Sequence, residues 1–229
     1  MSVADAIRSA VLRTTGTRIL EVFAGDDQVG MEMADLSNEA AADIAASHQW
    51  TILTKIAAIN GMGATSFDLP VDYDRMLIGS GLQDAASPFW GYERINSADE
   101  WVQRLNDGFT GPMKGWIILG GQLQFNPAPS GVVNFPYISS YWARSSEGDP
   151  KPAFDRDDDV FVLSERLLTL ALVWRWKESK GIEYAEDMAN YERALAQDQV
   201  KDGGARIITQ SYRFNRLNAR QSYVNRIGG

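Results

Sequence analysis

Residues 155–159, Asp-Arg-Asp-Asp-Asp, are the densest group of carboxylates in the chain that could bind a metal ion. Their alternate acids have the spacing of the first three ligands of a calcium-binding loop. The remaining loop positions do not fit, because Val160 replaces the required glycine and Arg166 replaces the closing glutamate. We therefore predict that these acids instead cap the start of the following helix, where free N–H groups and the helix dipole favour negative charge.

The other reactive side chains form no recognisable catalytic pattern. His48 is the only histidine and there is no cysteine, so neither a zinc site nor thiolate or disulfide chemistry is expected. The chain has no Gly-x-Ser-x-Gly nucleophile motif, and Gly61-Met62-Gly63 lacks the rest of a dinucleotide or phosphate-binding motif. A glycosidase needs only two carboxylates facing a cleft, but no local pattern selects a pair among the 30 acids. The sequence thus predicts no enzyme, and no catalytic, cofactor-binding or metal-binding residue.

Hydrophobic periodicity and capping residues predict the helices that would hold these side chains. Ser2 is a plausible N-cap for the first helix, and Gly16 ends it. Another helix is apolar on nearly all sides, from Leu167 to Trp174, so it is expected in the core. The predicted helices are residues 2–15, 31–47, 97–108, 164–180 and 183–199.

Shorter apolar runs bounded by turn residues predict strands. Asn60-Gly61 and Gly120-Gly121 are hairpin signals, and Pro136 demotes its strand to an edge or breaks it. The predicted strands are residues 50–59, 67–70, 76–78, 116–119, 122–125 and 132–142. The expected fold is α+β: a helical body with a small antiparallel β-sheet, residues 1–202, and an extended C-terminal arm, residues 203–229.

Charge is divided unevenly between body and arm. Residues 200–229 hold six Lys or Arg and one Asp, about +5, which leaves about −13 of the total of −8 on the rest of the chain. An acidic body argues against a nucleic-acid surface, which needs basic patches. The start of the chain has no signal-peptide pattern and the longest apolar run is too short to cross a bilayer, so a non-secreted protein without membrane contact is expected.

The arm combines basic and apolar residues but has too few apolar residues to build a core of its own. After Asp202 it contains no acid, yet it carries isoleucine, leucine, tyrosine and phenylalanine that a purely solvating tail does not need. Such a segment is expected to become ordered on a partner surface.

The order of several motifs resembles a known family. The set consists of Trp50, the segment 67–76 (FDLPVDYDRM), Trp116-Ile117-Ile118, the segment 123–129 (LQFNPAP), Tyr137, Tyr141, Asp155, Asp157, Asp158 and Trp174. In this order, over about Ala34 to Lys201, the chain resembles the head-to-tail adaptor proteins of tailed bacteriophages, in particular the tail accessory, or head-completion, factors of short-tailed phages.

This resemblance implies a structural role in the neck of the virion, for a protein made in the host cytoplasm. It implies a homo-oligomeric ring, expected to be dodecameric, bound beneath the portal after DNA packaging, through whose lumen genomic DNA passes on ejection. The ring would also carry a further tail or nozzle protein, and the C-terminal segment would reach the portal. The candidate portal-binding residues are Arg206, Tyr212, Arg213, Phe214, Arg216, Arg220, Tyr223 and Arg226.

Two alternatives stay open at this stage. One is a virion-associated peptidoglycan hydrolase, which would use two of the acids. The other takes the arm as a basic, aromatic strip that binds nucleic acid.

Overall fold

The chain forms two compact units in the computed structural model, which describes residues 2–77, 81–84, 91–106 and 114–203. The first, here called the helical unit, contains described residues 2–56, 70–77 and 136–203. The second, here called the sheet unit, contains described residues 57–69, 81–84, 91–106 and 114–135. The helical unit holds α1 (Val3–Thr15), α2 (Gln28–Ala46), the 3-10 turn η1 (Thr51–Leu53), β3 (Tyr73–Met76), β9 (Ala143–Arg144), β10 (Pro150–Lys151), β11 (Val160–Phe161), α4 (Glu165–Ser179) and α5 (Ala185–Gly203). The sheet unit holds β2 (Ser66–Asp68), β4 (Gln83–Asp84), β5 (Tyr92–Arg94), α3 (Ala98–Asn106), β6 (Lys114–Leu119) and β7 (Gln122–Asn126), while the unit boundaries fall inside β1 (Thr54–Asn60) and β8 (Val132–Ser139).

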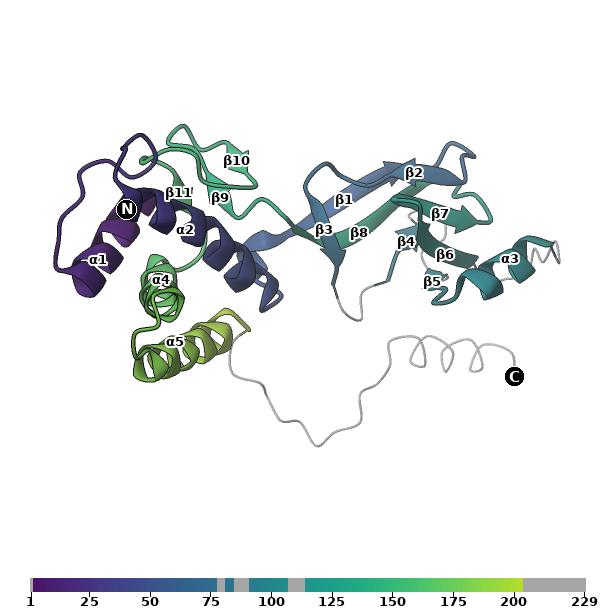
Figure 1. Ribbon diagram of the computed structural model, residues 1–229. Helices are drawn as coiled ribbons and strands as arrows, with labels where there is room; N and C mark the ends of the chain where they lie inside the picture. The colour runs from purple at the N-terminus through teal and green to yellow at the C-terminus, as the bar shows by residue number, and fades with distance from the viewer. Residues whose placement is uncertain (1, 78–80, 85–90, 107–113, 204–229) are drawn as a thin grey trace. The chain divides into compact units, whose positions relative to one another are not determined.

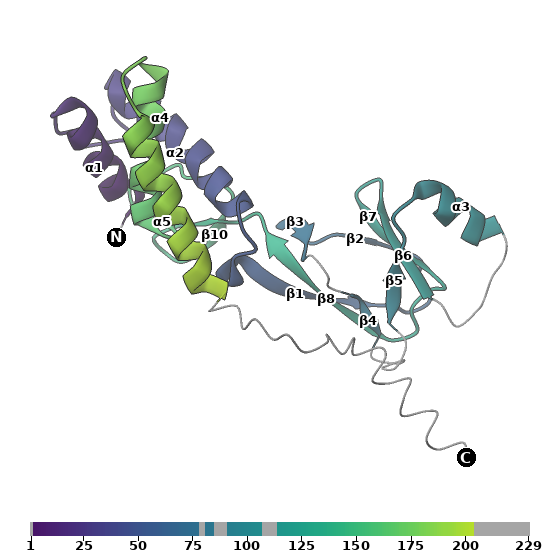
Figure 2. The same cartoon turned by 90° about the horizontal axis from the view of Figure 1, so that it is seen from below.

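The apolar helix α4 is the centre of the helical unit, as its sequence predicts. It packs against α1, α2 and α5, which lie around it in Figures 1 and 2. Leu167, Leu168 and Leu172 are completely buried there, and each such side chain contributes roughly 2 kcal/mol of hydrophobic free energy. The helix begins directly after Ser164, as expected.

The ends of the other helices follow from their capping residues. Before α1, the Ser2 N–H donates to Asp5 at 3.1 Å, and the left-handed Gly16 (φ 73°) ends the helix. The second helix starts three residues earlier than predicted, because the Asp27 carboxylate accepts from the N–H of Gly30 at 3.0 Å. The last helix continues to Gly203 rather than stopping at Gln199.

The sheet unit is built on a four-stranded sheet with the order β2-β7-β6-β5. Its β6–β7 hairpin turns at Gly120 and Gly121, whose φ angles of 60° and 77° require glycine, and this prediction is confirmed. On one face of the sheet, Trp101 of α3 packs with Ile95 and Ile117, and all three are buried.

The expectation of a helical body with one small antiparallel sheet is wrong. The class is α+β, but the described residues form three sheets, and β5 pairs with β6 in parallel. The helices therefore account for only part of the body. Local sequence marks the strands, whereas contacts between distant segments decide how they pair.

The predicted hairpin at Asn60-Gly61 is also wrong. In the structure β1 pairs with β8, and β2 pairs with β7. Gly61 is required for a different reason: its N–H donates to the carbonyl of Gly131 at 3.0 Å, and a Cβ there would lie 2.2 Å from the carbonyl oxygen of Pro129. Glycine thus allows two backbone segments to approach closely.

Pro136 neither makes β8 an edge strand nor breaks it, contrary to expectation. That strand lies between β1 on one side and β3 and β4 on the other. Among the described residues, residues 137–139 pair with β3 and residues 133–134 pair with β4, so Pro136 pairs with neither of these strands. A residue without an N–H is tolerated at such a position.

Candidate functional site

The eight candidate portal-binding residues, all at or beyond Arg206, lie outside the described residues. The structure therefore describes the point where the arm begins, which is the last turn of α5. We refer to the contacts of Asp202 with Thr51 and His48 as the arm root.

The arm root is held by a nearly buried carboxylate. Asp202 accepts a hydrogen bond from the backbone N–H of Thr51 at 2.9 Å and another from its hydroxyl at 2.6 Å. The His48 Nε2 atom lies 3.5 Å from the same carboxylate, whose side chain is only 14% exposed. Thr51 is the first residue of η1, so Asp202 acts on that turn as an N-cap supplied from another helix.

Arg75 stabilises the segment directly before Thr51, the residue to which Asp202 is hydrogen-bonded. Its guanidinium donates to the carbonyl of His48 at 3.0 Å and to that of Ala46 at 3.2 Å. These carbonyls belong to the end of α2, which has no basic residue in its own last turn. A cation from β3 thus stabilises the negative end of the helix dipole. This gives the arginine of the segment 67–76 (FDLPVDYDRM) a structural role.

Asp72, in the same segment, is the centre of a hydrogen-bond network. Asp72 accepts from Lys55 at 2.6 Å, from the Tyr137 hydroxyl at 2.8 Å and from the Ser139 hydroxyl at 2.6 Å. Burial acts to raise the pKa of Asp72, but hydrogen bonds from Lys55, Ser139 and Tyr137 outweigh it and lower this pKa to about 2. Conversely, burial and the bond to Asp72 raise the pKa of Tyr137 to about 12.

The low pKa of Asp72 predicts a loss of stability in acid. Because the folded-state pKa lies below the ordinary value of 3.8, its contribution of about 2 kcal/mol is present above pH 4 and is lost as the pH falls toward 2. We expect Asp72→Asn to destabilise the protein at pH 7, with a difference from wild type that shrinks over this interval in urea unfolding. The control is Asp74→Asn, since Asp74 has a 42% exposed side chain and, among the described residues, pairs with its neighbour Arg75 alone. A difference that does not change between pH 5 and pH 2 would contradict this assignment.

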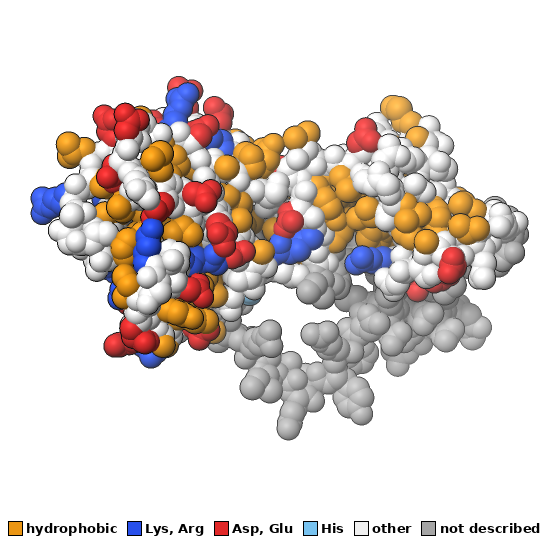
Figure 3. Space-filling view, in the orientation of Figure 1, with side chains coloured by type: hydrophobic (Ala, Val, Ile, Leu, Met, Phe, Trp, Pro, Cys, Tyr) orange, Lys and Arg blue, Asp and Glu red, His pale blue; other side chains and the backbone are white. Residues whose placement is uncertain are grey.

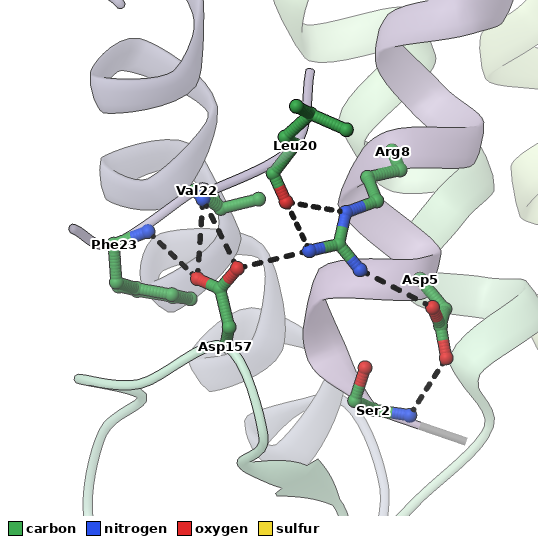
Figure 4. Close-up of polar contacts among 7 residues, drawn as sticks. All are labelled: Ser2, Asp5, Arg8, Leu20, Val22, Phe23 and Asp157. Carbon is green, nitrogen blue, oxygen red and sulfur yellow. Dashed lines mark hydrogen bonds and ion pairs between the residues drawn. The ribbon is translucent and has the colours of Figure 1, made fainter. Parts of the chain in front are cut away.

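The acids of residues 155–159 do not cap α4, so that prediction is wrong. The Asp157 carboxylate accepts from the N–H groups of Val22 and Phe23, the latter at 2.9 Å, and from Arg8 at 3.0 Å (Figure 4). Arg8 also donates to the carbonyl of Leu20, as Figure 4 shows. This acid thus holds the segment between α1 and α2, a contact between residues far apart in the sequence.

Asp159 is completely buried and organises its own loop. It accepts from the N–H groups of Asp155 at 2.8 Å and Arg156 at 3.1 Å, and from Lys151 at 2.7 Å. Within the described ranges, no group of three acids or histidines is placed to hold a metal ion.

The shifted carboxyl groups do not resemble a hydrolase site. A glycosidase needs one carboxyl group with a raised pKa to act as the general acid. Among the described residues, the carboxyl groups whose pKa departs clearly from the ordinary value are Asp5, Glu32, Asp72 and Asp155, and in each it is lowered. No observation on these groups therefore favours the hydrolase alternative.

Acidic side chains are spread over the face of the helical unit seen in Figure 3, rather than gathered in one patch. Several are paired within the unit: Arg175 contacts both Glu39 and Asp43, and Lys180 lies 2.7 Å from Glu32. The acids on this face are thus dispersed, and several of them lie in ion pairs.

The comparison with protein families decides where this scaffold belongs. A family model described as SU10 adaptor protein matches residues 1–221, which include all of the described structure and most of the arm. The chain belongs to this family. No curated protein matches it.

The match confirms the predicted resemblance to phage head-to-tail adaptors and extends it. The motifs reached from about Ala34 to Lys201, whereas the family match also includes α1 and continues to residue 221. The family description names an adaptor, which is a structural component of the virion neck. Among the described helices of this adaptor, none is both long and apolar enough to span a membrane.

The sequence did not predict the contacts of the arm root. It placed Asp202 at the end of the body, three residues beyond the last predicted helix, and Thr51 inside the predicted strand 50–59, and it noted His48 only as the one histidine of the chain. A signal appears only once α5 is known to continue to Gly203: an acid in the last turn of a helix opposes the helix dipole, which suggests a contact elsewhere.

Proposed function

We propose that this adaptor forms a homo-oligomeric ring, expected to be dodecameric, beneath the portal, where it extends the DNA channel and joins a further tail or nozzle protein. The observation that carries this proposal is the family match over residues 1–221, because it includes the body and most of the basic arm. In this account the body is the structural part of the ring and the arm is the attachment to the portal.

The chemistry of the arm supports its role as the portal-binding segment. Arginine forks bind carboxylates through two hydrogen bonds, and tyrosine and phenylalanine fill apolar pockets, so both are the usual anchors of protein interfaces. The proposed anchors are Arg206, Tyr212, Arg213, Phe214, Arg216, Arg220, Tyr223 and Arg226.

The acidic body suits a conduit for DNA. A net charge of about −13 on residues 1–199 gives a repulsive potential toward phosphate. A duplex that passes through a ring of such bodies is not retained by phosphate contacts, whose strength depends on basic residues.

The test is the mass of the purified protein with and without its own portal protein. We expect a monomer or weakly associated species alone, and a complex of ring stoichiometry when portal is added, both measured by mass photometry. No complex with portal, or a complex whose mass does not correspond to a ring of this protein, would contradict the proposal.

A further inference from the structure

The arm root contains an acid in an electrostatically unfavourable position. Asp202 lies in the last turn of α5, where the helix dipole is negative and cations are favoured. Its side chain is also largely withdrawn from water, at 14% exposure. The unfavourable helix dipole and the loss of hydration both cost free energy. The contacts of the Asp202 carboxylate offset these costs and explain why an acid stands at this position.

The residue that Asp202 holds belongs to a rigid corner. Just before Thr51, the Trp50 indole donates to the carbonyl of Ile44 at 2.8 Å, and the Trp50 side chain is buried. Just after it, Leu53 is buried with 2% exposure. Together with Arg75, which holds the end of α2, these contacts fix Thr51 on the body of the helical unit.

The arm root lies directly before the arm. Gly203 is the last residue of α5, so one residue separates the pinned carboxylate from the chain that follows. The last turn of a helix ordinarily frays, and a frayed end would let the arm start at many positions. A carboxylate bonded twice to a fixed turn prevents this.

We propose that Asp202 is a positioning residue that fixes the point at which the arm leaves the body. This inference rests on the proposed function, in which the arm binds the portal. A fixed origin lowers the entropy that the arm loses on binding and raises its effective concentration at its site. In a ring, it also gives every copy the same starting point.

The test compares Asp202→Ala with Asp198→Ala in the full-length protein. Asp198 lies one turn earlier on α5 and contacts Lys201, a 71% exposed side chain, at 3.1 Å. Both variants remove one negative charge near the arm, so their electrostatic effect on portal binding is the same. We expect Asp202→Ala to weaken portal binding about 5- to 10-fold, because the variant must order one or two more groups on binding than the wild type. We expect Asp198→Ala to leave portal binding within about 2-fold of the wild type.

Further measurements separate positioning from general stability. Hydrogen exchange at the Thr51 amide should become faster in Asp202→Ala, while thermal unfolding of the body should stay close to wild type. Asp202→Asn should restore part of the affinity, because its amide oxygen still accepts from Thr51. Thr51→Val should weaken binding less than Asp202→Ala does, and the double variant should be no weaker than Asp202→Ala alone.

Two results would overturn the inference, and they differ from failure of the proposed function. Equal portal affinity of Asp202→Ala and Asp198→Ala, with wild type binding normally, would remove the positioning role alone. A loss of affinity matched by a loss of body stability would assign Asp202 a structural role only. Absence of portal binding by wild type would contradict the proposed function as well.

Discussion

Replacing Asp159 with alanine is expected to lower the free energy of unfolding of the helical unit by about 3–5 kcal/mol, the range for breaking a buried ion pair on one side. The substitution leaves the N–H groups of Asp155 and Arg156 without their acceptor, in a site where the Asp159 side chain has no exposure. It also removes one of the two carboxylates that pair with the Lys151 ammonium, the other being that of Asp155. Urea unfolding followed by far-ultraviolet circular dichroism reports this change, because α1, α2, α4 and α5 all belong to that unit.

Asp158→Ala is the matched control. Asp158 is the adjacent acid and is exposed, so its removal should change the free energy of unfolding by no more than about 0.5 kcal/mol. Asp159→Asn should lie between the two, because it keeps one acceptor oxygen. A loss below about 1 kcal/mol in Asp159→Ala would show that this network does not stabilise the unit.

The helices were predictable because their information is local. Ser2, Asp5 and Gly16 define the first helix within one stretch of sequence, and the apolar residues of α4 announce a buried helix without reference to the rest of the chain. The β6–β7 hairpin was equally local, since Gly120 and Gly121 supply the turn that its two strands need.

The strand pairings and the acidic network depend on residues far apart in the sequence. Pro136 reads as a strand breaker, but among the described residues it lies where its strand changes partner from β4 to β3 and pairs with neither. Asp157 reads as a helix cap until Val22 and Phe23 are seen to donate to it. Neither partner can be inferred from the neighbourhood of the residue in the chain.

The candidate site also combines features that the sequence predicts with a contact that it does not predict. Composition predicts a basic, aromatic arm, and the family match confirms the adaptor resemblance that gave the arm its expected partner. The portal-binding residues themselves stay a prediction. The arm root was not predicted, because the contact between Asp202 and Thr51 joins positions 151 residues apart.

Removing residues 204–229 is expected to abolish portal attachment while the body stays folded. The deletion removes all eight proposed anchors but keeps α5 complete through Gly203, together with the arm root and the described cores of both units. If only two anchors are hot spots of about 2 kcal/mol each, affinity falls at least about 1000-fold.

A second variant distinguishes charge from geometry. Changing Arg206, Arg213, Arg216, Arg220 and Arg226 together to lysine keeps the charge of the arm but removes the planar forks. We expect it to bind portal more weakly than wild type and more strongly than the truncated chain. The arm variant Gln210→Ala, which changes none of the proposed anchors, serves as the control and should bind normally.

The affinity of the truncated chain for its own portal, set beside that of the full chain under the same conditions, is the most direct measurement. A folded truncated body that no longer binds portal, as judged by circular dichroism and mass photometry, is the predicted result. A truncated chain that binds portal as tightly as the full chain would show that the arm is not the attachment.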